Sequence, residues 1–244
     1  MKLLSIIYSY YNQPKMLIKV INVINMYCDD IKEKIELIIV DDGSKESPLI
    51  KKNIDCDSTF IKISEDVGFN NGGAKNLGIK YATGKWCLIL DLDHWFDHNE
   101  MRKVIKFCEG QYNRSLLEYI KTVKGIDNYW YLISRVTSSG KNLNPNPNVK
   151  LVIRSFLSQC MYDEDFSGYY GYEDVLQMIM LNNLLGKHRI LPKIKVYLDQ
   201  DEDDSNTISI TQRDTTRNKQ LLKDKISGVA PYSKNHFRTK YIIL

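Results

Sequence analysis

Two aspartates one residue apart follow an apolar run in the segment KWCLILDLDHWFD, residues 85–97. The run 86–90 predicts a buried strand. Because alternate residues of an extended segment point the same way, Asp91 and Asp93 can face one site while Leu92 faces the core. Two close carboxylates are costly to desolvate without a cation, and hard oxygen ligands suit Mg2+ or Mn2+. The pattern indicates a divalent metal site, with a pair of solvated acids as the alternative.

A second acidic pair, Glu173-Asp174, directly precedes a segment whose apolar residues recur at helical spacing up to residue 185. A helix N-terminus favours a carboxylate over the protonated acid. We therefore expect both groups to be ionised and able to accept a proton. An N-terminal capping pair is the alternative interpretation.

These residues require a scaffold in which strands and helices alternate. The expected strands are 3–8, 35–40, 60–64, 86–90, 129–136, 149–154 and 194–198. The expected helices begin at Pro14 and cover 74–81, 99–124 and 174–185. This order predicts an α/β fold with a mostly parallel sheet flanked by helices. In such sheets ligands collect at the carboxyl ends of the strands, where this chain has polar clusters at 8–10, 41–42 and 91–94.

Composition narrows the class of protein. The 244 residues carry a formal net charge of +4 with acids and bases well mixed, which does not favour a nucleic-acid partner. The five cysteines are scattered without a CxxC pair, so we expect free thiols in a reducing compartment. No signal peptide or bilayer-length apolar run is evident, and we expect a soluble, cytoplasmic protein. The oligomeric state is left open.

Four segments in order resemble the inverting family 2 glycosyltransferases of GT-A fold. They are SIIYSYYNQPKML (5–17), ELIIVDDGSKES (36–47), GFNNGGAKNLGIKYATGKWCLILDLDH (68–94) and YDEDFSGYYGYEDVLQMIM (162–180). The last block is closest to galactosyl- and chondroitin-type transferases. The resemblance implies a GT-A domain over 1–200, with a nucleotide-sugar-binding half at 1–95 and an acceptor half at 96–200. Residues 201–244 are expected to form an acidic loop and a basic helical tail.

The resemblance also implies roles for residues of the first half. The expected donor-binding set combines the turn after the first strand, the Asp-Asp-Gly-Ser turn, the Gly/Asn-rich loop with the helix after it, and the start of the DxD motif. Its members are Tyr8, Ser9, Tyr10, Asp41, Asp42, Asn71, Gly72, Lys75, Asn76, Asp91 and Leu92. For Asp41-Asp42 a plain turn, and for Lys75 a solvated helix charge, stay open as alternatives.

The same resemblance implies a reaction. Asp93 corresponds to the metal-binding acid, Asp91 to an acid that contacts ribose or the metal, and His94 is a weaker candidate ligand. Relatives often have a histidine after the last strand, whereas this chain has Asp199 and Asp201 there. The implied base is Asp174, with Glu173 as acceptor ligand or alternative base. A glycan hydroxyl would attack the anomeric carbon of a nucleoside-diphosphate sugar, with UDP as the expected nucleotide, and invert it.

Two other functions remain open from the sequence. A nucleotide- or glycan-binding module could keep the fold and lack turnover. A phosphatase of the haloacid-dehalogenase type also uses DxD after an apolar strand, although there the motif usually lies near the N-terminus.

Overall fold

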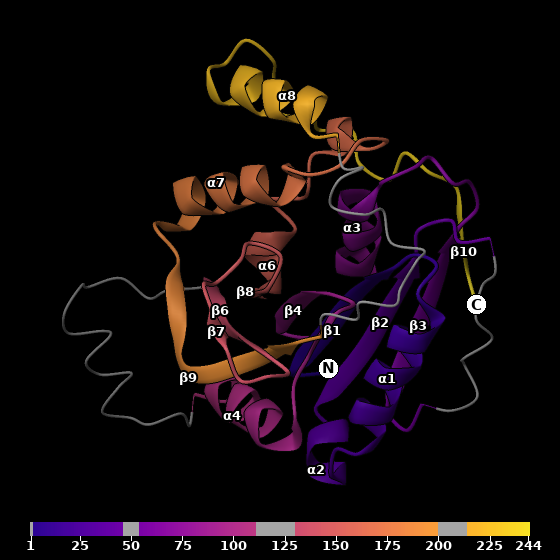
Figure 1. Cartoon of the computed structure of the whole chain (residues 1–244), viewed down its shortest axis with the longest axis vertical. Helices are drawn as coiled ribbons and strands as arrows, with labels where there is room; N and C mark the ends of the chain where they lie inside the picture. The colour runs from indigo at the N-terminus through magenta and orange to yellow at the C-terminus, as the bar shows by residue number, and fades with distance from the viewer. Residues whose placement is uncertain (1, 46–53, 111–129, 200–213) are drawn as a thin grey trace.

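The computed structural model describes residues 2–45, 54–110, 130–199 and 214–244, which form one sheet covered by helices on both faces (Figure 1). The strands follow the order β10-β3-β2-β1-β4-β8-β6-β9-β5, and β7 pairs with β6. Their bounds are β1 Leu4–Tyr10, β2 Ile35–Asp41, β3 Asp57–Ile63, β4 Trp86–Asp91, β5 His94–Trp95, β6 Trp130–Thr137, β7 Asn142–Leu143, β8 Lys150–Ile153, β9 Arg189–Leu198 and β10 Tyr241–Ile243.

The sheet is parallel in its first half and mixed in its second. Strands β3, β2, β1 and β4 are parallel neighbours, as expected from the sequence. Strand β8 then runs antiparallel to both β4 and β6, and β9 is parallel to β6 and antiparallel to β5. The α/β prediction is confirmed, with the parallel part concentrated in the half that holds β1 to β4.

Helices cover the two faces of the sheet because alternate strand residues point to opposite sides. On one face, Leu4, Ile6 and Tyr8 of β1 share a buried cluster with helices α1, α2 and α4. On the other face, Ile7 belongs to a cluster with α3, α6 and α7. The helices are α1 Pro14–Asn25, α2 Asp29–Lys32, α3 Asn71–Tyr81, α4 His98–Cys108, α6 Arg154–Leu157, α7 Glu173–Leu185 and α8 Thr216–Ile226, with a 3-10 turn, η2, at Glu164–Phe166.

Strand register brings the polar clusters together at one edge. Ser9 lies opposite Asp91 in the β1–β4 pair, and Tyr10 lies opposite Asp41 in the β1–β2 pair. Because parallel strands end on the same side, these residues meet above the carboxyl ends of β1, β2 and β4. The polar side chains expected to form a site therefore lie next to one another at this edge of the sheet.

The expected elements are found with shifted bounds. Helix α3 begins at Asn71 instead of residue 74, and α4 ends at Cys108, so the expected helical segment 111–124 lies outside the described residues. The tail does contain a helix, α8. Strand β10 was not predicted, and it pairs antiparallel with β3 at the sheet edge (Figure 1). The end of the chain is thus part of the same sheet as β1.

Within the described ranges, none of the helices is long and apolar enough to cross a bilayer.

Candidate active site

A cavity of about 1190 Å³ opens above the carboxyl ends of β1 and β4 and below the start of α7. It is lined by residues of both halves of the chain. Ten of the residues predicted from the sequence contribute to its wall: Ser9, Tyr10, Asp42, Asn71, Asp91, Leu92, Asp93, His94, Glu173 and Asp174. The cavity is large enough for a nucleotide-sized ligand together with a second substrate.

Asp91 is the less exposed of the two aspartates in the DxD motif. The Nζ of Lys75, a fully buried lysine of α3, lies 2.5 Å from its Oδ1. The charge of Lys75 and a hydrogen bond from it outweigh the burial of the carboxyl, so the pKa of Asp91 is lowered. The sequence left open whether Lys75 is solvated, and the structure answers that it is paired. Lys75 and Asp91 therefore form a fixed ion pair at the cavity floor.

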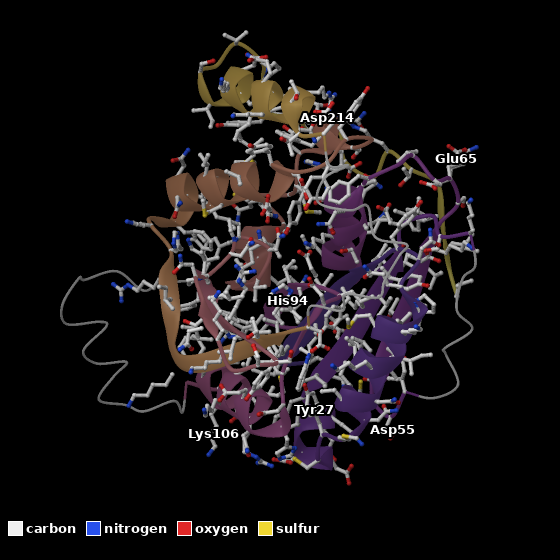
Figure 2. All side chains as sticks on the ribbon, viewed as in Figure 1. Tyr27, Asp55, Glu65, His94, Lys106 and Asp214 are labelled. Carbon is white, nitrogen blue, oxygen red and sulfur yellow. The ribbon has the colours of Figure 1, made fainter. Side chains whose placement is uncertain are left out.

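Asp93 is the accessible end of the motif. Its side chain is 44% exposed, and its Oδ1 lies 2.6 Å from the Nδ1 of His94. His94 itself is buried near the middle of the molecule (Figure 2), and its Nε2 is a buried atom without a hydrogen-bond partner. Of the two aspartates, Asp93 has the carboxylate more open to a ligand from the cavity.

The sequence left a third protein ligand open, and Asp199 does not join this pair. Asp199 is buried and forms an ion pair with Lys19, and it does not line the cavity. Asp201 lies outside the described residues. Among the residues that the structure describes, no group of three or more His, Cys, Asp or Glu side chains is arranged to hold a metal ion. Among the described residues, Asp91 and Asp93 are therefore the carboxylates of this motif that could hold a cation.

The second acidic pair sits on the opposite wall. Glu173 and Asp174 are the first two residues of α7, and the preceding Tyr172 has a left-handed backbone with φ of 72°. Glu173 accepts a hydrogen bond from Asn71 Nδ2 at 3.3 Å, and the same amide lies 3.5 Å from Asp91 Oδ1. Asn71 therefore links the acids of α7 to the DxD motif.

Burial changes the protonation expected for this pair. Burial is the largest cause of the raised pKa of Glu173, which is about 7. The charge of Asp174 raises this pKa further. Burial also raises the pKa of Asp174, against the opposing charges of Lys150 and Lys75. The expectation that the helix N-terminus keeps both groups fully ionised is thus wrong for Glu173, because desolvation is stronger than the helix dipole.

The two acids of the Asp-Asp-Gly-Ser turn have different hydrogen-bond partners. Asp41 accepts a hydrogen bond from the Ser44 amide at 2.8 Å, which is turn chemistry, and it does not line the cavity. Asp42 lines the cavity and accepts hydrogen bonds from the amide and side chain of Asn70, both at 3.0 Å. Burial raises the pKa of Asp42 to about 8. Asp42 is therefore a buried polar group that faces the ligand space.

Three further predicted donor contacts lie behind the cavity wall. Tyr8 is buried in the core and donates its hydroxyl to the carbonyl of His94 at 3.0 Å. Asn76 is fully buried and bonds both the amide and the carbonyl of Tyr162. At Gly72, a Cβ would approach Tyr162 Cβ to 3.1 Å and Glu173 Cγ to 3.3 Å, so the glycine permits close packing. These residues support the wall and do not line the space.

Two basic residues of β6 and β8 were missed in the sequence. Arg135 of β6 lines the cavity, and burial lowers its pKa while Asp93 and Asp91 oppose that effect. Lys150 of β8 is fully buried, and burial followed by the charge of Lys75 lowers its pKa to about 7. No local motif marks either residue; alternation along the strands was the only available signal.

Comparison with known proteins decides the family. The family model of glycosyl transferase family 2 matches residues 5–162, which is more than half of the chain. The chain belongs to this family. The match ends before Glu173, so the family assignment rests on the half that holds the DxD motif.

Two curated relatives match parts of this family 2 chain. A dolichyl-phosphate beta-glucosyltransferase of Dictyostelium discoideum is 33% identical over 112 residues, which cover 41% of the chain and 34% of that protein. An uncharacterized glycosyltransferase of Rickettsia bellii is 38% identical over 85 residues, covering 32% of the chain and 11% of that protein. The chain therefore matches about a third or less of the length of these relatives.

Solved structures share the fold of this family 2 chain. S. aureus TarS in complex with UDP-GlcNAc superposes with a TM-score of 0.61 at 16% identity, covering 83% of this chain and 59% of that one. A mannosyltransferase, PcManGT from Pyrobaculum calidifontis, in complex with GDP-Man and Mn2+ gives 0.55 at 14% identity, covering 80% and 56%. At such identities the likeness supports the GT-A fold alone.

Proposed function

We propose that this family 2 chain is a metal-dependent, inverting glycosyltransferase that moves a sugar from a nucleoside-diphosphate donor to a glycan hydroxyl. One observation carries the proposal: Asp91 and Asp93 on the floor and Asp174 on the opposite wall line the same cavity. A donor held by the first pair would present its sugar toward the second. UDP is the proposed nucleotide, in line with TarS, which binds UDP and UDP-GlcNAc.

The floor supplies the donor site. Asp93 is the proposed metal ligand because its carboxylate is the accessible one, and Asp91, fixed by Lys75, is the second. The donor set of hard oxygens fits Mn2+ or Mg2+. When bound, the ion would neutralise charge on the diphosphate. The positive charges of Arg135 and the exposed Lys45 on the cavity wall favour the same anion.

The opposite wall supplies the base. Asp174 is the proposed proton acceptor: burial raises its pKa, and the charges of Lys150 and Lys75 oppose that rise and favour the carboxylate. It would take the proton of the acceptor hydroxyl as that oxygen attacks the anomeric carbon. Glu173, whose pKa is raised by burial to about 7, is the proposed acceptor ligand. The resemblance of residues 162–180 to galactosyl- and chondroitin-type transferases stays a prediction about the class of acceptor.

A binding screen tests the donor proposal. Nucleotide sugars are added to the wild type with Mn2+ or with EDTA, and the melting temperature is measured. We expect a UDP-sugar to raise the melting temperature only with Mn2+, and Asp93→Asn to abolish that rise while the fold stays intact. The exposed Asp55, which does not line the cavity and lies at the periphery (Figure 2), provides the matched control Asp55→Asn. Equal stabilisation in EDTA would contradict the role of the metal.

A further inference from the structure

The C-terminal helix α8 lies against the loop that leads into α7 (Figure 1). Leu222 of α8 shares a buried cluster with Phe166 of that loop and Leu176 of α7. The two residues that begin α7 are the acids of the active site. A segment more than 40 residues beyond Glu173 in the sequence is therefore in contact with the wall that carries it.

Asn218 is the centre of this contact. It is fully buried, and its Nδ2 donates to the carbonyl oxygens of Phe166, Tyr169 and Gly171 at 3.1, 2.9 and 2.9 Å. Its Oδ1 accepts from Arg217 Nη1 at 2.8 Å. One side chain thus fixes three backbone carbonyls within a stretch of six residues. Without this amide, one buried and two partly buried carbonyl oxygens would lose their donor, so the arrangement favours one loop conformation.

A buried ion pair makes a second connection. The Nζ of Lys225, at the end of α8, lies 2.8 Å from Asp163 Oδ2 and 2.7 Å from Asp165 Oδ2. The side chains of Lys225 and Asp163 are almost fully buried. Breaking such a pair leaves an uncompensated charge, which is strongly destabilising. The loop is therefore held by α8 at its start as well as at its end.

The loop held in this way forms the acceptor side of the cavity. Gly171 has φ of 86° and Tyr172 has φ of 72°, so the chain enters α7 through two successive left-handed residues. Both residues line the cavity together with Thr215, the residue that precedes α8. Changes in the loop would move Glu173 and Asp174 because they follow it directly.

We infer that Asn218 is a positioning residue that sets the acceptor side of the active site. It acts by holding the 166–171 loop, and through it the first turn of α7. The catalytic part of this inference rests on the proposed function. The part that concerns the conformation of the 166–171 loop rests on the contacts of Asn218 alone. The inference assigns the C-terminal segment to the catalytic machinery, whereas the sequence treated that segment as a tail. A role in global stability alone would leave the balance between donor and acceptor binding unchanged.

Hydrogen exchange of the full chain tests whether Asn218 keeps the 166–171 loop in one conformation. Asn218→Asp keeps the shape of the side chain and replaces the donating amide nitrogen by a carboxylate oxygen. That oxygen would face the three carbonyl oxygens without a hydrogen to donate. Asn235→Asp is the matched control, because Asn235 is exposed and holds Ser233 and Arg238 through its backbone. We expect at least about tenfold faster exchange of amides in 167–176 for Asn218→Asp only. Unchanged exchange there would overturn the inference, whatever the enzyme does.

Kinetics test the positioning. UDP binding with Mn2+ is measured by calorimetry, and transfer from UDP-GlcNAc to a panel of p-nitrophenyl glycosides by UDP release. For Asn218→Asp we expect UDP affinity within about twofold of wild type, and a rise in acceptor KM or fall in kcat of roughly 10–100-fold, since small misplacements of reacting groups have effects of this size. A parallel loss of UDP affinity, or normal transfer, would overturn the positioning role.

A second variant covers the case in which Asn218→Asp does not fold. Arg217 is exposed, donates to the carbonyl of Asp165 at 2.7 Å, and lies 4.6 Å from the centre of the Tyr169 ring. Arg217→Ala loosens the same loop without burying a charge, and we expect the same exchange and kinetic changes at smaller size. A wild type that releases no UDP would contradict the proposed function. The hydrogen-exchange result would still decide whether α8 keeps the loop before α7 in one conformation.

Discussion

Substitution of Glu173 by glutamine should stabilise the protein at alkaline pH. A protonated carboxyl and an amide are both uncharged and planar, and each has one carbonyl oxygen that accepts and a second group that donates, so glutamine approximates the protonated form of the buried side chain. Asn71 can still donate to the remaining carbonyl oxygen, as it does to Glu173 Oε1. The other oxygen, Oε2, is a buried atom without a hydrogen-bond partner. The variant therefore removes the charge while the packing is retained.

The magnitude follows from the raised pKa. In the unfolded chain Glu173 ionises near 4.5, whereas in the folded protein its pKa is about 7. Between these values folding takes up a proton, so stability falls as the pH rises, and above pH 7 the loss is complete. At about 1.4 kcal/mol per pH unit, the total is about 3 kcal/mol. The glutamine variant lacks this loss, so its advantage over wild type should grow from near zero below pH 4.5 to about that size at pH 8.

Urea denaturation at a series of pH values measures the effect. The quantity compared is the change in free energy of unfolding between pH 5 and pH 8, in wild type, Glu173→Gln and a control. Glu65→Gln is the matched control because Glu65 lies exposed at the periphery (Figure 2). Other buried acids such as Asp42 titrate in all three proteins and cancel in the comparison. Equal pH dependence in all three would refute the argument that burial controls the charge of Glu173.

Three further outcomes follow from the same geometry. Asp174→Asn should lower transfer by roughly 10²–10⁴-fold while UDP affinity with Mn2+ is kept; a loss of this size in Glu173→Gln but not in Asp174→Asn would move the base to Glu173. Asn76→Ala should lower the free energy of unfolding by about 3 kcal/mol in urea, because it leaves buried polar groups of Tyr162 without partners; a loss no larger than that of Asn235→Ala would contradict this. The first-formed product should have the anomeric configuration opposite to that of the donor by proton NMR, and a retained anomer would exclude single displacement.

The parts of the site that depend on local pattern were predictable. The apolar run placed Asp91 at the end of β4, with Asp93 in the turn directly after it, and apolar spacing placed Glu173 and Asp174 at the start of α7. Each rule needs only a few neighbouring residues. The parallel direction of β1 to β4 was predictable for the same reason, since apolar runs alternating with helices favour a parallel sheet, whereas the order of these strands in the sheet was not.

The parts that depend on distant contacts were not predictable. The sequence favours a solvated acidic loop around Asp199, but Asp199 is buried and pairs with Lys19, 180 residues away. Whether Tyr8 faces a ligand or the core depends on which helix covers that side of β1. The protonation of Glu173 depends on its burial and on neighbouring charges from three separate elements. These quantities are set by tertiary packing, which no local spacing encodes.

Release of nucleoside diphosphate tests the central claim most directly. Wild type is incubated with UDP-sugars, Mn2+ and a panel of glycan acceptors, and UDP and free phosphate are measured separately. The account predicts UDP release with a glycosylated acceptor in equal amount, lost in EDTA and reduced at least about a hundredfold in Asp174→Asn. Release of free phosphate, or tight donor binding without any UDP release, would contradict the assignment of Asp91, Asp93 and Asp174 to sugar transfer.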